Sequence, residues 1–252
     1  MTKLKVILIL VACLSGVSTV WAQVSLTKGG SGADEFELVK SGKAAKLYYD
    51  IRDFEVIKKS AHLFSNDVRL VTDREIAVSE AVEEMSSNCI IVGTLGHNEL
   101  IDKLILKKKL DVSTLKDKWE SFHIEVVRNP FPGVKKALVV VGSDRRGTAY
   151  GLFSISESIG VSPWYWWADA PVAKRKELCL KVQKMTSEEP TVKYRGIFIN
   201  DEDWGLLRWA KTNFEKERGN IGPKTYAKVC ELLLRLKANY LCPAMHEAST
   251  AF

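Results

Sequence analysis

The sequence predicts an α/β fold in two parts, and two patterns along the chain support this prediction. Between residues 45 and 159, short apolar segments typical of strands alternate with amphipathic segments typical of helices. After residue 190 the pattern changes to strand, long loop, helix and strand, and both apolar segments end on polar or charged residues. We therefore expect an N-terminal α/β domain over residues 35–187, followed at residues 190–252 by the truncated start of a (β/α)8 barrel.

Hydrophobic periodicity defines the elements of the first domain. A helix over residues 53–70 is predicted from apolar residues at helical spacing, namely Phe54, Ile57, Ala61, Phe64 and Val68. The same reasoning predicts strands at residues 45–49, 89–92, 122–126, 137–141 and 178–182, and helices at residues 98–106 and up to residue 159. The strands at 122–126 and 137–141 should pair across the proline-containing turn between them.

A glycine-containing turn follows the strand at residues 137–141. The spacing of Gly142 and Gly147 imitates a phosphate-binding loop, but Thr148 stands where that loop requires lysine, which argues against a nucleotide site. The glycines instead indicate a tight turn and a close approach of the next helix to the sheet. The polar stretch at residues 187–190, which ends in proline, marks the boundary of the domain.

The second part begins with an apolar strand that starts at residue 194. This strand runs into a polar segment made of Asn200, Asp201, Glu202, Asp203 and Trp204. A loop of about 20 residues follows, which is longer than ordinary loops and therefore typical of a functional segment. A helix should then start at Pro223, with an apolar stripe formed by Tyr226, Val229, Cys230, Leu233 and Leu236. A second apolar segment ends at His246 and Glu247.

The acidic strand end favours one kind of chemistry. Because neighbouring residues on a strand face opposite sides, Asp201 and Asp203 can face one cleft while Glu202 faces away. Glycoside hydrolysis needs a pair of carboxyl groups, one to protonate the leaving oxygen and one to attack or to activate water. A solvated or helix-capping acidic turn would give the same pattern, and His246 fits either substrate binding or a structural hydrogen bond.

Composition argues against several other functions. The formal net charge of +6 is a mild excess, and the basic run at residues 107–109 has no aromatic platform beside it, so nucleic-acid binding is not expected. Histidine and cysteine never fall at metal-ligand spacing, so we expect no zinc. We interpret four cysteines as buried free thiols, with a disulfide as the alternative in an oxidising compartment: Cys89, Cys179, Cys230 and Cys242. Trp164, Trp166 and Trp167 are either core anchors or stacking surfaces for sugars.

The N-terminus has the pattern of a secretory signal over residues 1–22. Lys3 and Lys5 precede an apolar run that is too short to span a bilayer, and small residues lead to a cleavage site after Ala22. The residues up to Cys13 also resemble a lipobox, which would place a lipid on Cys13, but the segment before it is short for that role. We expect a secreted or periplasmic protein whose mature chain starts with a flexible segment at residues 23–34.

Five segments resemble glycoside hydrolase family 115, the secreted xylan α-glucuronidases: residues 142–151, 160–169, 198–206, 219–226 and 233–247. The resemblance implies an N-terminal α/β domain, a (β/α)8 catalytic barrel, and removal of (4-O-methyl-)glucuronic acid from glucuronoxylan by inverting hydrolysis. It implies that Asp201 and Asp203 are catalytic and that the substrate is bound by Asn200, Glu202, Trp204, His246 and Glu247. It implies no metal or organic cofactor, and it leaves room for a homo-oligomer of the full-length protein.

Two positions depart from the family pattern. Cys242 stands where a large aromatic residue, usually Trp, is expected, and Arg208 stands where an uncharged residue is usual. The first departure leaves the substrate preference open. Because a barrel takes about 250 residues, we expect this chain to be part of an enzyme and to be inactive alone. The alternative is a catalytically inert secreted protein that binds carbohydrate or serves as a scaffold.

Overall fold

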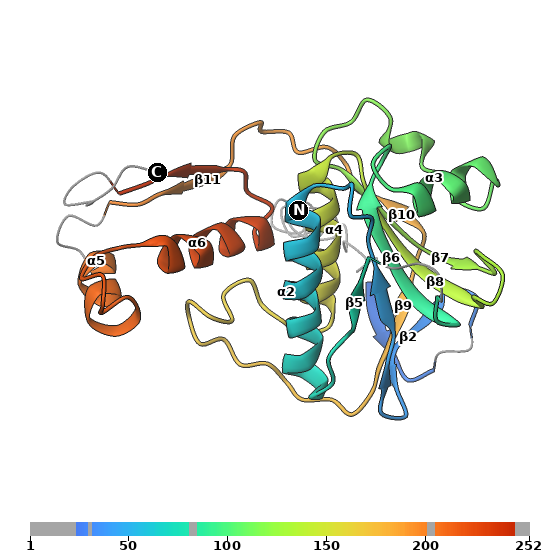
Figure 1. Ribbon diagram of the computed structural model, residues 1–252, viewed down its shortest axis with the longest axis horizontal. Coiled ribbons are helices and arrows are strands. Elements are labelled where there is room, and N and C mark those ends of the chain that lie inside the picture. Colours follow the sequence, from blue (N-terminus) through green and yellow to red (C-terminus); the bar gives the residue numbers. More distant parts are fainter. Residues whose placement is uncertain (1–23, 30–31, 81–84, 201–204, 245–252) are drawn as a thin grey trace, which may run out of the picture.

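The computed structural model describes residues 24–29, 32–80, 85–200 and 205–244, which form three sheets with associated helices (Figure 1). Two of the sheets are built from residues before position 187, and the third is built from residues after position 195. Parallel and antiparallel pairs both occur, so the predicted α/β class is confirmed.

The largest sheet has six strands and occupies the centre of the N-terminal region. In spatial order its strands are β10 (Met185–Thr186), β7 (Phe122–Arg128), β8 (Lys136–Gly142), β6 (Asn88–Thr94), β4 (Lys46–Tyr48) and β5 (Val78–Ser79). The last four run parallel, whereas β7 pairs antiparallel with β8 as predicted and β10 pairs antiparallel with β7. The longer parallel strands read as continuous apolar runs because both faces of the sheet are covered.

Helices cover the two faces of this sheet. On one face α2 (Glu55–Thr72) packs against α4 (Arg145–Ser158), and α3 (Glu99–Leu106) lies on the opposite face (Figure 1). Asn98 caps α3, because its side chain accepts hydrogen bonds from the backbone N–H groups of Leu100 and Ile101 at 3.0 and 3.2 Å. A 3-10 turn at Ser113–Leu115 interrupts the connection from α3 to β7. The predicted helices are confirmed, with boundaries shifted by one or two residues.

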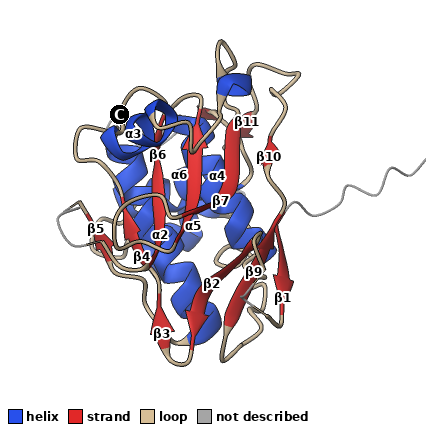
Figure 2. Cartoon of the chain, turned by 90° about the vertical axis from the view of Figure 1, so that its right-hand side faces the viewer, coloured by secondary structure: helices blue, strands red, loops and turns tan. Residues whose placement is uncertain are grey.

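A second sheet of four antiparallel strands packs beside α2 and α4 (Figure 2). Its order is β1 (Val24–Thr27), β9 (Leu178–Val182), β2 (Glu35–Lys40) and β3 (Lys43–Ala44). Phe36, Leu38 and Leu180 are fully buried and belong to the same apolar core as the two helices. The prediction of a flexible segment at residues 23–34 is wrong for residues 24–27, because their backbone groups pair along β9.

Glycines allow α4 to lie close to the sheet, as the sequence predicted. A Cβ atom at Gly147 would lie 2.2 Å from the carbonyl oxygen of Ser121, and one at Gly142 would lie 2.0 Å from the backbone nitrogen of Thr148. The Thr148 hydroxyl is buried and lies 3.0 Å from the hydroxyl of Thr94. The position that a phosphate loop fills with lysine is therefore part of the packed interior.

The third sheet is a parallel pair, β11 (Gly196–Phe198) and β12 (Tyr240–Cys242), connected through α6 (Pro223–Arg235). Pro223 occupies the first turn of α6 as predicted. The predicted long loop before this helix is partly helical, because α5 (Leu206–Trp209) continues into a π-helical turn at Ala210–Phe214. A strand–helix–strand unit of this kind is the repeating element of a (β/α)8 barrel, and the barrel itself stays a prediction.

The buried face of α6 differs in part from the predicted stripe. Tyr226, Val229 and Leu233 are buried as expected, but Cys230 is exposed and Leu236 is 38% exposed. The prediction of a buried thiol is therefore wrong for Cys230, because α6 also turns Glu231 and Arg235 inward against the N-terminal region. Cys89 and Cys179 are buried, Cys242 is half-buried, and these four described cysteines are free thiols. None of the described helices is long and apolar enough to cross a membrane.

Candidate functional site

The carboxyl ends of β11 and β12 lie side by side (Figure 1). Phe198 is in register with Cys242, and the backbone N–H of Ile199 donates a hydrogen bond to the carbonyl oxygen of Cys242 at 2.9 Å. Because the two strands are parallel, both chains leave the sheet at the same edge. The segments that the sequence singled out therefore start from neighbouring points on one edge of the sheet.

Only one of the predicted site residues is among those the structure describes. Asn200 is exposed and follows β11 after a single intervening residue. The other predicted site residues lie outside the described residues: Asp201, Glu202, Asp203, Trp204, His246 and Glu247. The structure thus brings together the strand ends that precede these residues, and the roles assigned to their side chains stay predictions.

Tyr226 fixes the end of β12 to α6. Its hydroxyl accepts a hydrogen bond from the backbone N–H of Ala244 at 3.1 Å, and the side chain is 9% exposed. Between the helix and the sheet lies a small apolar core that includes Ile199, Val229 and Leu233. The carboxyl ends of both strands are therefore fixed against one helix, α6, as a preorganised site requires.

Glu215 fixes the N-terminal end of α6, the same end that carries Tyr226. Its carboxylate accepts hydrogen bonds from the backbone N–H groups of Gly222 and Thr225 at 2.9 Å each, and from the Thr225 hydroxyl. Burial alone would raise the pKa of Glu215, but these hydrogen bonds outweigh it and hold the pKa below its usual range. No sequence motif indicates this contact, because Glu215 lies outside the usual capping-box spacing.

Four aromatic side chains pack into a cluster beside α5 and α6. The ring centroid of Trp166 lies 4.8 Å from that of Trp167, 5.7 Å from that of Trp209 and 5.1 Å from that of Phe214. The indole N–H of Trp167 donates a hydrogen bond to the carbonyl oxygen of Lys228 on α6 at 3.2 Å. Of the two interpretations of the tryptophans, the structure therefore favours packing anchors for Trp166 and Trp167.

Glu120 links the N-terminal region to the opposite ends of β11 and β12. Its buried carboxylate forms ion pairs with Arg146 of α4 and with Arg195, and it accepts a hydrogen bond from the Asn239 amide at 2.8 Å. Burial would raise the pKa of Glu120, but the hydrogen bonds from Arg195, Asn239 and Arg146 hold it below its usual range. Because Arg195 precedes β11 and Asn239 precedes β12, this one carboxylate orients both strands.

A second buried ion pair joins α6 to α2. The Arg235 guanidinium donates to both carboxylate oxygens of Asp67 at 2.8 Å, and it pairs with Glu231 at 2.9 Å. Arg235 is 2% exposed, and its guanidinium lies 4.7 Å from the ring centroids of Phe153 and Tyr165. Burial disfavours the charged guanidinium, but Asp67 and Glu231 outweigh this effect and hold the pKa of Arg235 above its ordinary value.

The described residues contain no group of three or more His, Cys, Asp or Glu side chains that could hold a metal ion. His123 is buried, but its ring nitrogens lie within hydrogen-bond distance of Thr186 at 2.8 Å and of Glu125 at 3.0 Å. Lys184 pairs with the same Glu125 carboxylate at 3.0 Å. His123 is thus a satisfied structural histidine, in agreement with its place on β7.

The chain is similar to proteins of one glycosidase family. Residues 187–252 match the model of glycosyl hydrolase family 115. A solved structure of a family GH115 4-O-methyl-alpha-glucuronidase with specificity for decorated arabinogalactans shares 39% identity with this chain, at a TM-score of 0.70. The match covers 84% of this chain and 26% of that chain, so this chain spans about a quarter of the length of that relative.

A second solved structure, that of CpGH84D, shares 10% identity, at a TM-score of 0.42, and covers 86% of this chain and 35% of that chain. This likeness is too weak to support any argument about function. No curated protein matches the chain.

Proposed function

Because the chain belongs to glycoside hydrolase family 115, we propose that it forms part of an α-glucuronidase that removes (4-O-methyl-)glucuronic acid side chains from a polysaccharide. The observation that carries this proposal is the match of residues 187–252 to the family model, together with the parallel β11–α6–β12 unit in the same segment. Active sites of (β/α)8 barrels lie at the carboxyl ends of the strands. β11 and β12 end at one edge of their sheet, shortly before residues 200–204 and 245–247 in the sequence, which supports the proposal.

In the proposed reaction Asp201 and Asp203 are the two carboxyl groups. One protonates the glycosidic oxygen as the polysaccharide leaves, and the other removes a proton from the water that attacks the anomeric carbon on the opposite face. An inverting reaction of this kind requires the two groups to be about 6.5–9.5 Å apart to admit the water. Asn200, Glu202, Trp204, His246 and Glu247 are proposed to surround the sugar, where carboxylates and amides bind its hydroxyl groups.

The polysaccharide could carry either a xylan or an arabinogalactan backbone. The family resemblance favours glucuronoxylan, whereas the similar solved structure has specificity for decorated arabinogalactans. Cys242 is the last residue of β12 and is half-buried, so a residue smaller than the usual aromatic stands at this end of the strand. We propose that this position influences which of the two backbones is accepted.

The test is the release of 4-O-methylglucuronic acid from glucuronoxylan and from decorated arabinogalactan. We expect release by a version extended to the length of the solved relative, of which this chain spans about a quarter. We expect no release by the 252-residue chain, because the two parallel strands β11 and β12 do not enclose a barrel. In the extended protein Asp201→Asn and Asp203→Asn should each lower the rate by about 10²–10⁴-fold. Glu188→Gln, which changes an exposed carboxylate, is the matched control.

Two results would overturn the proposal. Undiminished release after both aspartate substitutions would remove these residues from the reaction. No release by either length of the protein, together with binding of the polysaccharide, would favour the catalytically inert carbohydrate-binding protein instead.

We also propose that the protein is secreted or periplasmic, on the basis of the signal pattern at residues 1–22. Mass spectrometry of the mature protein from its native host tests this. A mature N-terminus at Gln23 is the expected result. A lipidated Cys13 would show an anchored protein, and an intact Met1 terminus would contradict both routes.

A further inference from the structure

A cavity lies in the N-terminal region, where the chain changes direction across the six-stranded sheet. β4 and β6 are parallel neighbours. From β4 the chain passes through α2 on one face and returns as β5, whereas from β6 it passes through α3 on the other face and continues to β7 and β8. The two connections diverge, which leaves a crevice beyond the carboxyl ends of β4 and β6. In open α/β sheets such switch points are the usual places for ligands.

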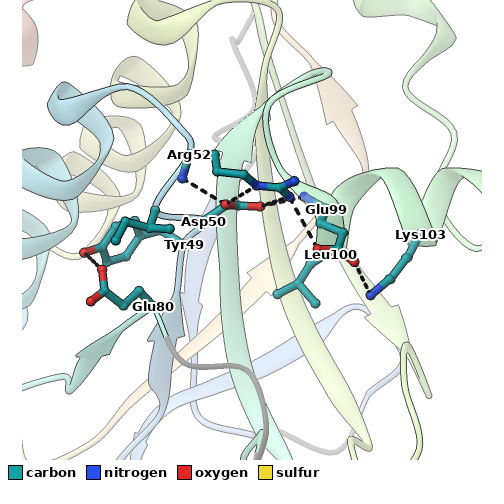
Figure 3. A pocket seen from close by; sticks show the side chains of 8 residues that line it. Tyr49, Asp50, Arg52, Glu80, Glu99, Leu100 and Lys103 are labelled. Carbon is teal, nitrogen blue, oxygen red and sulfur yellow. Dashed lines mark hydrogen bonds and ion pairs between the residues drawn. The ribbon is translucent and has the colours of Figure 1, made fainter.

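The crevice contains a cavity of about 230 Å³ (Figure 3). Its walls come from three separate connections: the segment after β4, the residue after β5, and the first turns of α3. The lining residues are Tyr49, Asp50, Ile51, Arg52, Glu80, Glu99, Leu100 and Lys103. The cavity thus combines two aliphatic side chains and one tyrosine with five charged groups, within a space suited to a ligand of one sugar ring rather than a large cofactor.

Asp50 holds the cavity in shape. Its carboxylate accepts hydrogen bonds from the Arg52 guanidinium at 2.6 and 3.0 Å and from the backbone N–H of Glu99, at the start of α3, at 3.0 Å (Figure 3). These bonds fix one edge of the guanidinium and tie the loop after β4 to α3. Arg52 nevertheless remains 63% exposed at the side chain. The structure therefore presents an oriented arginine, whose position a ligand need not organise.

The groups that remain for a ligand lie around this arginine. Glu80 extends from the opposite side and accepts a hydrogen bond from the Tyr49 hydroxyl at 3.2 Å (Figure 3). Glu99 pairs with Lys103 at 2.6 Å, and both side chains are about half-exposed. Carboxylates and a guanidinium can each form paired hydrogen bonds, a geometry that suits neighbouring hydroxyl groups on a ring.

Ile51 supplies an apolar surface beside these polar groups. It is 71% exposed although it is a large hydrophobic residue, and it lines the cavity together with Leu100. A pyranose or furanose ring has the complementary character, because C–H groups form its faces and hydroxyl groups its rim. Exposed aliphatic surface next to oriented charged groups is what such a ring requires of a binding site.

The charges of the cavity indicate a neutral ligand. Three carboxylates line it, against two cationic side chains, and both of these are already paired with carboxylates. A uronic acid or a phosphate would therefore meet a net negative surface. A neutral sugar meets no such repulsion, because it needs hydrogen-bond partners and not a compensating charge.

We propose that this crevice binds one neutral glycosyl unit, a pentose or a hexose, between Arg52, Glu80 and Ile51. If the chain acts on polysaccharides as proposed above, the crevice would hold an uncharged unit of the same polymer. The binding site itself is inferred from sheet topology, the cavity and its charges, and it does not depend on hydrolysis.

The experiment measures binding of methyl β-D-xylopyranoside, methyl α-L-arabinofuranoside and methyl β-D-galactopyranoside to the 252-residue chain by saturation-transfer NMR and titration. At least one should bind with a dissociation constant of about 1 mM. Arg52→Lys, which keeps the charge and loses the planar fork, and Ile51→Asp, which changes an exposed side chain, should each weaken binding at least about tenfold. Lys59→Gln on α2, another exposed position, should leave binding unchanged.

Thermal unfolding of each variant separates loss of binding from loss of fold. If Arg52→Lys alters the unfolding transition, its weaker binding no longer tests the site, and the binding result of Ile51→Asp is used instead. The proposal is overturned if none of the glycosides binds, if binding survives Ile51→Asp, or if glucuronate binds more tightly than every neutral glycoside. None of these readouts involves release of uronic acid, so the result does not depend on whether the proposed hydrolysis occurs.

Discussion

The N-terminal region and the β11–α6–β12 unit are both α/β structures, but they are stabilised in different ways. The six-stranded sheet has apolar cores on both faces, and many of its side chains are fully buried. The two-stranded sheet has α6 on one face, and Phe198 and Tyr240 on its strands remain 58% and 52% exposed. The first region therefore has a core large enough to fold by itself, whereas the second depends on its attachment to the first.

This attachment is ionic at two places. Glu120 binds the starts of both strands, and Asp67 binds Arg235 on α6. Buried ion pairs contribute little net stability, because desolvation offsets the attraction, but removal of one partner leaves an uncompensated buried charge. The comparison thus indicates that the small unit can be released from the large one by changes at a few polar residues.

The largest effect is expected when the α2–α6 ion pair is broken. Asp67→Ala leaves the Arg235 guanidinium buried with one carboxylate fewer, which should cost about 3–5 kcal/mol. In urea, tryptophan fluorescence, to which the clustered Trp166, Trp167 and Trp209 contribute, should change before the circular dichroism of the sheet.

The control for this prediction is Lys59→Ala in the same helix. Lys59 forms an exposed ion pair with Glu55 at 3.3 Å, so its loss should cost no more than about 1 kcal/mol. If the fluorescence and circular dichroism transitions of Asp67→Ala coincide, the two regions unfold as one body. If neither transition is shifted from that of the unmodified protein, the ion pair between Asp67 and Arg235 is dispensable for stability.

Gly147→Ala should lower the free energy of unfolding by a smaller amount, and it should do so in both regions. The added Cβ would meet the carbonyl oxygen of Ser121 at 2.2 Å, so α4 or β7 must move, at a cost of about 1–3 kcal/mol. Because α4 carries Arg146 and Tyr150, which contact Glu120 and Ala238, both optical signals should shift together in a urea titration. Ser158→Ala in the same helix is the control, and a shift confined to the tryptophan signal would contradict the prediction.

Acid should weaken the cap that Glu215 forms at the N-terminal end of α6. Its folded-state pKa lies below the ordinary value of about 4.3. The stability it contributes is therefore fully present above that value and is lost as the pH falls through the folded-state pKa. Glu215→Gln should lower the unfolding free energy at pH 7 by about 1–3 kcal/mol and flatten its dependence between about pH 5 and 3. If the unfolding free energy of Glu215→Gln depends on pH in the same way as that of the unmodified protein, another carboxylate is responsible for the loss of stability in acid.

The smallest effect is expected on the open face of β11. Phe198→Ser changes a side chain that is 58% exposed, so the unfolding free energy should change by less than about 0.5 kcal/mol. Ile199→Ala, at the adjacent buried position, should cost roughly 2 kcal/mol or more. Equal losses in the two variants, measured by urea unfolding, would show that the face carrying Phe198 is covered in solution.

Elements were predicted correctly where the sequence pattern that specifies them lies within the element itself. The stripe from Phe54 to Val68 and the run at Cys89–Val92 specified α2 and β6, because burial of apolar side chains follows the period of the element. Residues 24–27 were misread, since their composition is typical of a loop and their pairing partner lies in β9. Cys230 was misread because the buried face of α6 is displaced from the predicted stripe and includes Glu231 and Arg235 instead.

In the candidate site, too, some features could be predicted from the sequence and others could not. The sequence indicated two strands with polar ends and the residues that follow them, from Asn200 to Trp204 and at His246 and Glu247. It contained no sign that Glu215 caps α6, because this residue lies outside the usual capping-box spacing. It also contained no sign that Glu120 joins the two strands, because that contact connects distant parts of the chain. Nor could it reveal the crevice of Arg52 and Glu80, which depends on the order of the strands in the sheet.

By itself, then, the sequence determined the α/β class, most of the buried strands and helices, and the segments that match the family, because each depends on residues close together in the chain. Only the tertiary structure decided the strand order, the ion pairs that attach α6, and the cavity beside β4. These depend on which distant surfaces meet, and Asp67 meets Arg235 across 168 positions. Chain entropy opposes such contacts, and only the packed cores around them make them favourable.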